Sequence, residues 1–322
     1  MDKRTFLQAA SVLTMLLATR AVAQSNVSKV TRIVVPFATG GTTDVVARIL
    51  QAELARSFGN TVIVENKAGA GGRLGANEVA RAPADGHTIA LIADGFAIDS
   101  LIYKEMAYDP FKDFAPVSQL ARVPLVLVAR SSLPADDVTS LVALALREPG
   151  RISFGSVGVG SAQHLAGEFF AQKAGLKLLH VPYKGGSGAQ TDMMAGTLDI
   201  FWGSAAFAKP AIASGKIKAL GVASDRRSLA LPDLRTLAEQ GFNGYELYGW
   251  TGFVLPAGTP VQLVNHWYET ISRVMKLPEI EKRLSELGWE SIISSPEVFG
   301  QFIRAENTKW AQILKQANFS MQ

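Results

Sequence analysis

Apolar and polar positions along the first hundred residues follow an alternating strand and helix pattern. Short apolar runs predict strands at Thr31 to Phe37, Thr61 to Glu65 and His87 to Ala93. Between the first two, apolar residues recur at every fourth position from Val46 to Phe58, which places them on one face of a helix. This order of elements predicts a largely parallel sheet with right-handed crossovers.

A second alternating series begins after Pro124 and predicts a second α/β unit with its own sheet. Its expected strands are the run LVLVA and the ranges Ile152 to Phe154, Lys177 to Val181, Leu198 to Trp202 and Lys216 to Ala223; its expected helices cover Val138 to Leu146 and begin at Ser161 and Gly188.

One more strand, Tyr248 to Leu255, precedes a helical last third of the chain. The expected helices are Val261 to Met275, Pro278 to Leu287 and Pro296 to Lys315, the latter two entered through a proline that suits a first helical turn. We expect the late strand to return to the first sheet, so that the second series is inserted into the first. The predicted lobes are residues 24–122 with 248–322, and residues 123–247, with a ligand between them.

The N-terminal residues have the pattern of an export signal. A basic start, MDKR, is followed by an apolar run from Phe6 to Ala18 and by the A-x-A sequence of residues 21–23. Residues 1–23 are therefore predicted to be a secretory signal peptide, and the run is too short for a stable membrane span. Lys3 to Leu7 also resembles a twin-arginine signal, so both export routes remain open.

Composition narrows the class of protein. A chain of 322 residues that is 48% hydrophobic and 19% charged is long enough for two cores. Removing residues 1–23 takes away three basic residues and one acidic residue, so the net charge falls from +4 to +2. The basic residues form no long run, so a nucleic-acid or membrane-surface partner is not supported. The absence of cysteine excludes disulfides, thiol catalysis and thiolate metal sites.

The first predicted strand ends in a small polar loop, Ala38 to Thr43, that opens a helix. Thr42 or Thr43 is a natural N-cap, and the unpaired N–H groups of a first helical turn favour an anion. No G-x-x-x-x-G-K-[ST] motif is present, and residues 69–75 miss the G-x-G-x-x-G spacing, so a carboxylate fits better than a nucleotide phosphate. Asp44 is expected to complement the helix dipole, in preference to contacting the ligand.

A second glycine-rich loop lies between Phe154 and Phe170, again after a strand and before a helix, with Ser161 as its candidate N-cap. The two loops can face each other across a cleft. Catalytic signals are few: no G-x-S-x-G elbow occurs. His164 and Glu168 are four residues apart on a helix, but no third metal ligand is evident, so a surface pair or a cap contact is preferred. Trp202, at a strand end, is a core candidate that could also wall a pocket.

Several motifs carry a family resemblance that spans nearly the whole chain after residue 23. VVPFATGGTTDVVAR, VIVENKAGAGGRLGANEVARAPADGHT, YDPFKDFAPVSQLARVPLVLVA, GSVGVGSAQHLAGE, LHVPYKGGSGAQTDMMAGTLDI and LPAGTP together resemble the Bug family, the solute-binding proteins of tripartite tricarboxylate transporters. The resemblance implies a two-lobed α/β periplasmic binding protein of the Venus-flytrap type (type II), with a mostly parallel sheet in each lobe and C-terminal helices packed on the first lobe. It implies a monomeric receptor without a cofactor, not an enzyme. Such a receptor closes on a small carboxylate and delivers it to membrane permease subunits.

Carried over by position, the resemblance places the ligand in three segments. Backbone N–H groups, the hydroxyls of Thr43 and Ser161, and bridging waters would hold it, and the segment Val181 to Gly186 would form a third side of the cleft. The implied ligand-binding residues are Phe37, Ala38, Thr39, Gly40, Gly41, Thr42 and Thr43 in the first loop, Ser156, Gly160, Ser161, Ala162, Gln163 and His164 in the second, and Tyr183, Lys184 and Gly185 in the third.

Two departures from the family pattern concern specificity. Relatives often read G-T-H-A-I-N where this chain has Asp94 to Asp99, and they often carry Asp-Asn where Gly203 and Ser204 stand. We expect Asp94, at the carboxyl end of a parallel strand, to accept a hydrogen bond from an amine, amide or hydroxyl of a ligand with one carboxylate. Phe96 or Trp202 would then cover an apolar part of that ligand. The alternative is that Asp94 caps the next segment or pairs with a surface Lys or Arg.

Two other functions remain open at this point. The same fold can serve as a sensor that presents its ligand to a membrane histidine kinase. A hydrolase or lyase that uses Asp94 and His164 is the third hypothesis.

Overall fold

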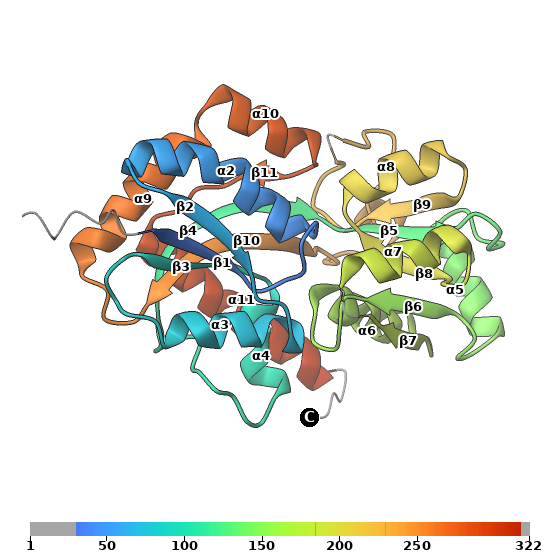
Figure 1. The fold of residues 1–322 in the computed structure, drawn as a ribbon. Coiled ribbons are helices and arrows are strands. Elements are labelled where there is room, and N and C mark those ends of the chain that lie inside the picture. Colours follow the sequence, from blue (N-terminus) through green and yellow to red (C-terminus); the bar gives the residue numbers. More distant parts are fainter. Residues whose placement is uncertain (1–29, 184, 229, 317–322) are drawn as a thin grey trace, which may run out of the picture.

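The computed structural model describes residues 30–183, 185–228 and 230–316, which form two α/β lobes, each built on its own sheet (Figure 1). The predicted signal peptide, residues 1–23, lies outside the described residues. Among the helices that are described, none is both long and apolar enough to cross a membrane.

The sheet of lobe 1 has six strands in the order β11-β4-β10-β3-β1-β2. Its three parallel neighbours are β2, β1 and β3, and the other strands join antiparallel. The strand bounds are β1 Thr31–Val35, β2 Val62–Asn66, β3 Thr88–Ala93, β4 Phe114–Pro124, β10 Tyr248–Pro256 and β11 Glu290–Ser291. The late strand β10 lies between β3 and β4, which confirms that the chain returns to the first sheet.

The sheet of lobe 2 has five strands in the order β7-β6-β8-β5-β9, again with three parallel neighbours, β7, β6 and β8. Strand β5 pairs antiparallel with β8 and β9. The expectation of mostly parallel sheets is therefore corrected to two mixed sheets, because β10 and β5, the strands by which the chain enters each sheet from the other lobe, run opposite to the parallel strands. The bounds are β5 Val126–Arg130, β6 Ser153–Ser156, β7 Leu179–Pro182, β8 Ile200–Gly203 and β9 Ile217–Val222.

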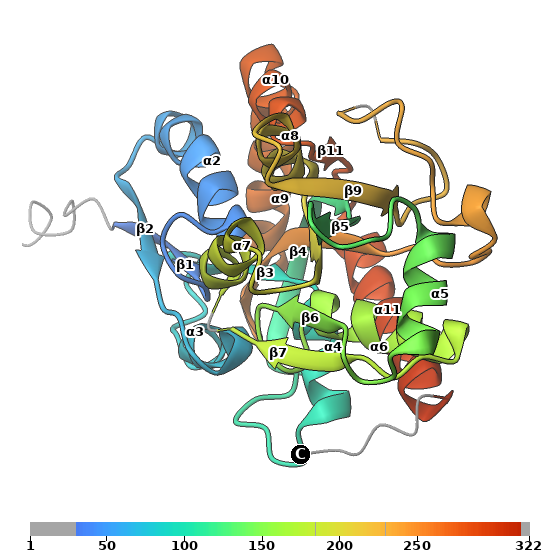
Figure 2. The same ribbon diagram turned by 90° about the vertical axis from the view of Figure 1, so that its right-hand side faces the viewer.

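Helices cover both faces of each sheet. In lobe 2, α5 and α6 contribute to the hydrophobic cluster on one face and α7 and α8 to the cluster on the other, an arrangement that Figure 2 shows from the lobe 2 side. The bounds in lobe 1 are α2 Thr42–Phe58, η1 Ala70–Gly72, α3 Arg73–Ala80, α4 Gly95–Ile102, α9 Val261–Met275, α10 Pro278–Glu286 and α11 Pro296–Gln316; those in lobe 2 are α5 Val138–Arg147, α6 Ala162–Ala174, α7 Gly186–Ala195, α8 Ala205–Ala213 and η2 Ala238–Gln240.

The predicted elements appear with small shifts at their ends, but α4, α8, β4 and β11 were missed, and no range was predicted for α3. Strand β4 buries the polar residues Ser118 and Gln119, so its apolar alternation is broken. Helix α4 has eight residues, too few to show a helical period, and it is apolar because it packs between the lobes.

The two sheets are joined where the chain crosses between them. Leu125, between β4 and β5, donates its N–H to the carbonyl of Leu247 at 3.1 Å and accepts the N–H of Ala223 at 2.8 Å. Leu247 in turn donates to the carbonyl of Ala223 at 2.8 Å. All three side chains are nearly inaccessible to solvent, so the crossing is an ordered connection.

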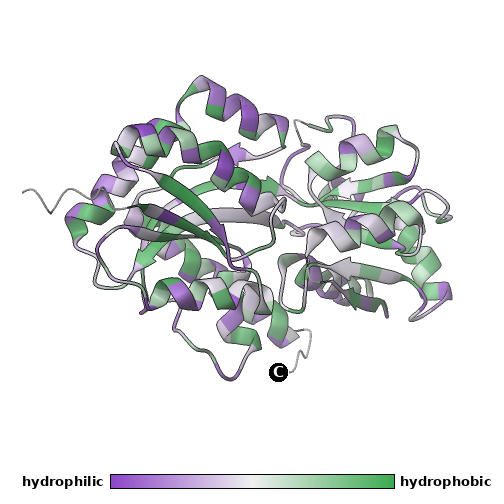
Figure 3. Cartoon of the chain, in the orientation of Figure 1, coloured by the Kyte–Doolittle hydropathy of each residue, from purple (hydrophilic) through white to green (hydrophobic). Residues whose placement is uncertain are grey.

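Helix α11 contributes to both lobes. Its first half packs on lobe 1 through Phe299 and Ile303, as expected for the C-terminal segment. Its second half differs from that expectation, because Trp310, Ile313 and Leu314 belong to a core cluster with lobe 2 residues such as those of α6. Hydrophilic and hydrophobic residues alternate along α9 and α10, as Figure 3 shows, so each of these helices buries one side.

Close packing in lobe 2 leads to a prediction at Gly167 of α6, which lies against the ring of the fully buried Phe154. A Cβ atom at this position would overlap that ring, so Gly167→Ala should lower the free energy of unfolding by about 1–3 kcal/mol. The matched control is Gly300→Ala in α11, whose Cβ would lie 3.5 Å from Pro116 Cγ, an ordinary contact. Urea unfolding measures both, and equal stabilities for the two variants would contradict the packing argument.

Candidate functional site

The loop between β1 and α2 leaves the first turn of α2 without a side-chain cap. Helix α2 begins at Thr42 after an extended Gly41 (φ −70°, ψ 164°), so the N-cap is Gly41 and not Thr42 or Thr43. Both threonine hydroxyls therefore lie inside the first turn. Within the part of the chain that the structure describes, the N–H groups of Thr42, Thr43 and Asp44 donate to no protein acceptor. They are available to an anion.

Asp44 holds this loop in shape. Its carboxylate accepts the N–H of Gly40 at 2.8 Å, the Nε of Arg48 at 3.0 Å and the Nδ2 of Asn66 at 2.9 Å. Burial raises the pKa of Asp44, but the bonds from Arg48, Gly40 and Asn66 outweigh it and hold the pKa below its ordinary value. Asp44 thus has the local structural role that was preferred, and its negative charge is neutralised by Arg48.

Asn66 is a second clamp that the sequence did not reveal. At the end of β2, it donates from Nδ2 to the carbonyl of Phe37 at 3.0 Å, and its Oδ1 accepts the hydroxyl of Thr39 at 3.1 Å. Because β1 and β2 are parallel neighbours, their carboxyl ends meet at one edge of the sheet. A polar residue directly after the second strand was the available signal.

The loop between β6 and α6 is closed by Ser161, which confirms Ser161 as an N-cap. Its hydroxyl accepts the N–H of His164 at 3.4 Å and donates to the carbonyl of Gly158 at 2.7 Å. Gly158 and Gly160 have φ of 137° and 84°, values that favour glycine. The Ser161 hydroxyl is therefore hydrogen-bonded within its own loop. The exposed loop of lobe 1 has no such side-chain cap.

Two stacked histidines support this second loop. The rings of His164 and His180 lie 4.0 Å apart between centroids; Ser156 Oγ is 2.7 Å from His180 Nε2, and Gly160 donates its N–H to His164 Nδ1 at 3.1 Å. Burial lowers the pKa of His164 to about 3, helped by the nearby His180, and burial lowers the pKa of His180 to about 4. Both rings are neutral at pH 7, and His180 was not recognised from the sequence.

His164 also lies near Glu168, with 3.8 Å between Nε2 and Oε1. No group of three or more potential metal ligands occurs among the described residues. This pair fits the expected local contact on one helix.

The third predicted segment lies beside the second loop. Tyr183 donates its N–H to the carbonyl of Ser156 at 3.0 Å, and its hydroxyl donates to Asp192 of α7 at 2.7 Å. Gly185, at φ 153°, precedes α7 and provides no side-chain cap. Lys184 lies outside the described residues.

Asp94 contacts the opposite lobe. Its Oδ2 accepts the N–H of Ala162, the first residue of α6, at 3.1 Å. It makes no side-chain cap on its own helix α4, and no salt bridge joins it to a Lys or Arg among the described residues, so neither alternative role is observed. Burial raises the pKa of Asp94 to about 6, against the lowering effect of its backbone hydrogen bonds, and the charge of Glu306 raises it further.

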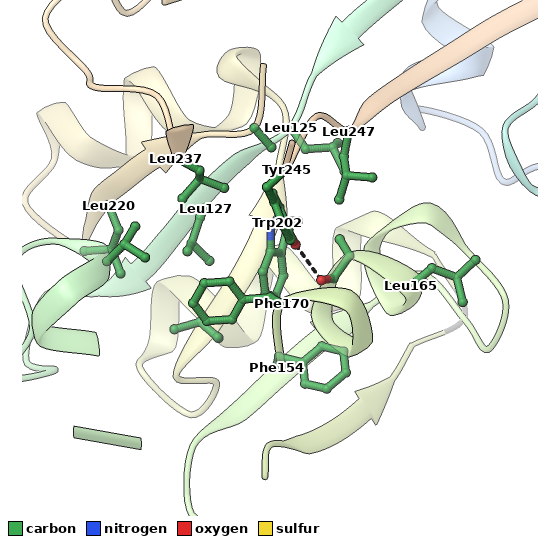
Figure 4. Packing of buried hydrophobic residues seen from close by; sticks show 14 of the residues in the cluster. Leu125, Leu127, Phe154, Leu165, Phe170, Trp202, Leu220, Leu237, Tyr245 and Leu247 are labelled. Atoms are coloured by element: carbon green, nitrogen blue, oxygen red, sulfur yellow. Dashed lines mark hydrogen bonds between the residues drawn. The ribbon is translucent and has the colours of Figure 1, made fainter. Parts of the chain in front are cut away.

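Phe96 and Trp202 belong to the cores. Phe96 is 5% exposed and packs against Tyr108 and Phe114 in lobe 1. Trp202 is inaccessible to solvent and packs with Phe170 in the core of lobe 2, as Figure 4 shows. The expectation that either ring covers a ligand is corrected: each ring points into the body of its own lobe.

A small cavity of about 10 Å³ lies next to the first loop, which is about the space for one water molecule. Phe37, Gly72, Phe96 and Asp99 are among its lining residues. A wider surface depression of about 520 Å³ lies elsewhere on lobe 1, between Ser100 and Asp113, and none of the predicted site residues line it.

Helix α4 fastens the second loop to lobe 1. Tyr103, just after α4, donates its hydroxyl to the carbonyl of Val159 at 3.2 Å, and the guanidinium of Arg73 lies 3.1 Å from the centroid of the Tyr103 ring. Gly160 is so close to Ile102 that an added Cβ would lie 2.7 Å from its Cδ1. These contacts were not predicted, because α4 itself was not.

Comparisons with known proteins agree with this architecture. A family model described as "Tripartite tricarboxylate transporter family receptor" matches residues 46–319. BugT of Bordetella pertussis is 30% identical over 293 residues, 90% of each chain. The structure of the periplasmic binding protein BugD has a TM-score of 0.85 at 34% identity and covers 91% of this chain and 99% of its own. The R. palustris protein Rpa4515, with adipate, has a TM-score of 0.88 at 32% identity, with 92% and 100% covered.

The buried histidine pair predicts a loss of stability in acid. The pKa of His164 lies below the value of about 6.5 in an unfolded chain, so below that pH the unfolded chain binds the additional proton and the folded state is destabilised, down to the folded-state pKa of about 3. Between pH 7.5 and 5.0, wild type should lose about 2 kcal/mol more than His164→Gln. Urea unfolding at both pH values tests this.

The buried acids change the pH dependence of stability in the opposite direction. Their effect is present in both wild type and His164→Gln, so it cancels when the two are compared. His266→Gln, on the exposed side of α9, is the matched control and should keep the pH dependence of wild type. An equal loss in wild type and His164→Gln would show that His164 is not held neutral.

Proposed function

Because the chain belongs to the family of tripartite tricarboxylate transporter receptors, we propose that it captures a small carboxylate between its lobes and delivers it to the membrane permease of such a transporter. Like its family and its structural relatives, it is a solute-binding receptor of the Bug type, and it is not an enzyme. Its relatives are periplasmic binding proteins, which implies that this protein is also located in the periplasm. Export by the predicted signal peptide is part of the proposal.

The open N-terminus of α2 is the observation on which the ligand class rests. Three consecutive N–H groups, from Thr42 to Asp44, lie at the positive end of a 17-residue helix. The loop lies at the carboxyl ends of β1 and β2, on the edge of lobe 1 that faces lobe 2 (Figure 1). Ligands of open α/β sheets bind at such ends. A carboxylate fits this group of donors, and the structure of the R. palustris relative contains adipate, which is a dicarboxylate.

Lobe 2 is proposed to provide the opposite wall. The N–H of Gln163 donates to no other described residue, and α7 begins at Gly186 without a side-chain cap. The hydroxyl of Thr43 remains a proposed contact. That of Ser161 would act indirectly, through the shape of its loop.

The lobes are proposed to move about the crossing at Leu125 and Leu247. The proposed lobes are residues 24–122 with 248–322, and residues 123–247; β4 continues two residues past this boundary, to Pro124. The packing of α4 and α11 against α6 buries Ile98, Ile102 and Trp310 in one cluster with Leu165, so separation on that side would expose apolar surface. We therefore infer that opening occurs on the side of α2 and α7.

Thr42→Pro tests the carboxylate site by removing one donor. Proline is tolerated at the first position of a helix, and the extended Gly41 suits a residue before proline, so the fold should be kept. A charge-assisted hydrogen bond contributes about 1.5–3 kcal/mol, so affinity should fall by at least about tenfold. A thermal-shift screen of mono- and dicarboxylates, aromatic acids and amino acids identifies the ligand, and calorimetry then compares the variants.

Val261→Pro is the matched control, because it makes the same change at the first position of α9, where the side chain is 63% exposed. It should bind as wild type does. The carboxylate site is wrong if no carboxylate raises the unfolding midpoint, or if Thr42→Pro retains full affinity.

Lobe closure is tested by small-angle X-ray scattering. Hinge closure around a ligand should reduce the radius of gyration when the ligand found in the screen is saturating. The same radius with and without that ligand would contradict closure about Leu125 and Leu247.

A further inference from the structure

We propose that Asp94 restricts this receptor to ligands that carry a single carboxylate. The inference rests on the proposed function, because it concerns the same space between the lobes. It goes further by naming which ligand charge is accepted and which residue decides it.

Asp94 already occupies an anion position of lobe 2. Its Oδ2 lies 3.1 Å from the N–H of Ala162, the first residue of the 13-residue helix α6. The start of a helix favours one negative charge, and here the protein supplies that charge from the opposite lobe. A ligand carboxylate at α6 would have to share this helix end with Asp94.

The other charged groups around Asp94 do not neutralise it. Glu306, from α11, and Asp99, five residues along α4, are the acids whose charges couple to it. The nearby cations are engaged elsewhere: Arg73 stacks on Tyr103 and acts on Asp99, and Lys309 lies 3.5 Å from Glu306. Behind Asp94 lies the uncharged strand β10, where a Cβ on Gly249 would be 4.0 Å from Oδ1. Among the described residues, no Lys or Arg forms a salt bridge with Asp94, so its charge is not compensated by a direct ion pair.

The position of Asp94 is fixed by the packing of α4. Ile98 and Ile102, one and two turns along that helix, are fully buried in a cluster that includes Leu165 of α6. The hydroxyl of Tyr103 also bonds to Val159 in the loop before α6. Asp94 therefore stays at the start of α6 when the lobes open on the other side.

Because of these contacts, the two ends of the site differ in charge and in open N–H groups. The first turn of α2 has three open N–H groups and a neutralised acid, whereas α6 already carries a carboxylate. A second carboxylate on the ligand would lie near Asp94 in a medium of low dielectric, where like charges repel strongly. An uncharged, hydroxyl or ammonium group at that end meets no such penalty.

The experiment compares ligands that differ only at the far end. The probes are hexanoate, 6-aminohexanoate and adipate, together with benzoate, 4-aminobenzoate and terephthalate, each titrated by calorimetry into wild type, Asp94→Asn and Asp94→Gly. Wild type should bind the best monocarboxylate of a set at least about tenfold more tightly than the dicarboxylate, a difference of about 1.4 kcal/mol. Asp94→Asn should reduce that ratio, and Asp94→Gly, which also frees the N–H of Ala162, should reduce it further or reverse it.

Asp99→Asn is the matched control. It removes a buried acid from the same helix, but one that accepts the hydroxyl of Tyr108 within lobe 1 and does not contact lobe 2. It should keep the preference of wild type. Circular dichroism checks that each variant is folded, and an unfolded Asp94→Gly would leave the comparison to Asp94→Asn.

The outcomes separate the two proposals. Wild type that binds a dicarboxylate as tightly as its monocarboxylate partner, or an Asp94→Asn variant with unchanged preference, overturns this inference and leaves the receptor function standing. A change of preference in Asp99→Asn equal to that in Asp94→Asn would also overturn it. Wild type and variants that bind none of the probes would count against both the inference and the proposed function.

Discussion

Three backbone hydrogen bonds among Leu125, Ala223 and Leu247 hold the point at which the chain crosses between the two sheets. Each sheet is covered by helices of its own lobe, and the lobes are joined by this crossing and by a core that α4 and α11 share with lobe 2. The residues at the crossing are buried, so the proposed movement about it would leave the two sheets intact. The position of every loop at the lobe interface depends on this arrangement, since it sets which strand ends face each other.

The two facing loops differ in how the backbone N–H groups at the start of their helices are satisfied. In lobe 1, Asp44 and Asn66 clamp the loop from behind and leave the start of α2 open. In lobe 2, Ser161 and the stacked His164 and His180 rings hold the loop from within. Asp94 accepts a backbone N–H at the start of α6 from across the interface. One helix start therefore keeps open N–H groups, and the other is bonded to a carboxylate of the protein. In the proposed receptor, this one side chain would make the two ends of the site differ in charge.

Helix α4 fixes the position of Asp94 through its packing. It is apolar because it packs into a core shared by both lobes, and it carries Asp94 at its start and Tyr103 at its end. The second half of α11 enters the same core through Trp310 and Leu314. One side of the interface is therefore fixed by hydrophobic packing, which confines any opening to the opposite side.

Local patterns in the sequence determined the strands and helices with a clear period and the loop from Phe37 to Thr43, because these depend on neighbours along the chain. The order of the elements indicated that one α/β series is inserted into the other, although the pairing of β10 with β3 and β4 is long-range. Local patterns also indicated Ser161 as an N-cap, a contact three residues long. The roles of Asn66, His180 and Asp94 were decided only by the tertiary structure, since their partners come from strands or helices 22 to 68 residues away. The prediction of Trp202 as a core residue is confirmed, and the expectation that Phe96 or Trp202 covers a ligand was wrong for the same reason: an aromatic residue at or just after a strand end can face a ligand or a core, and only the packing of the whole lobe selects the core.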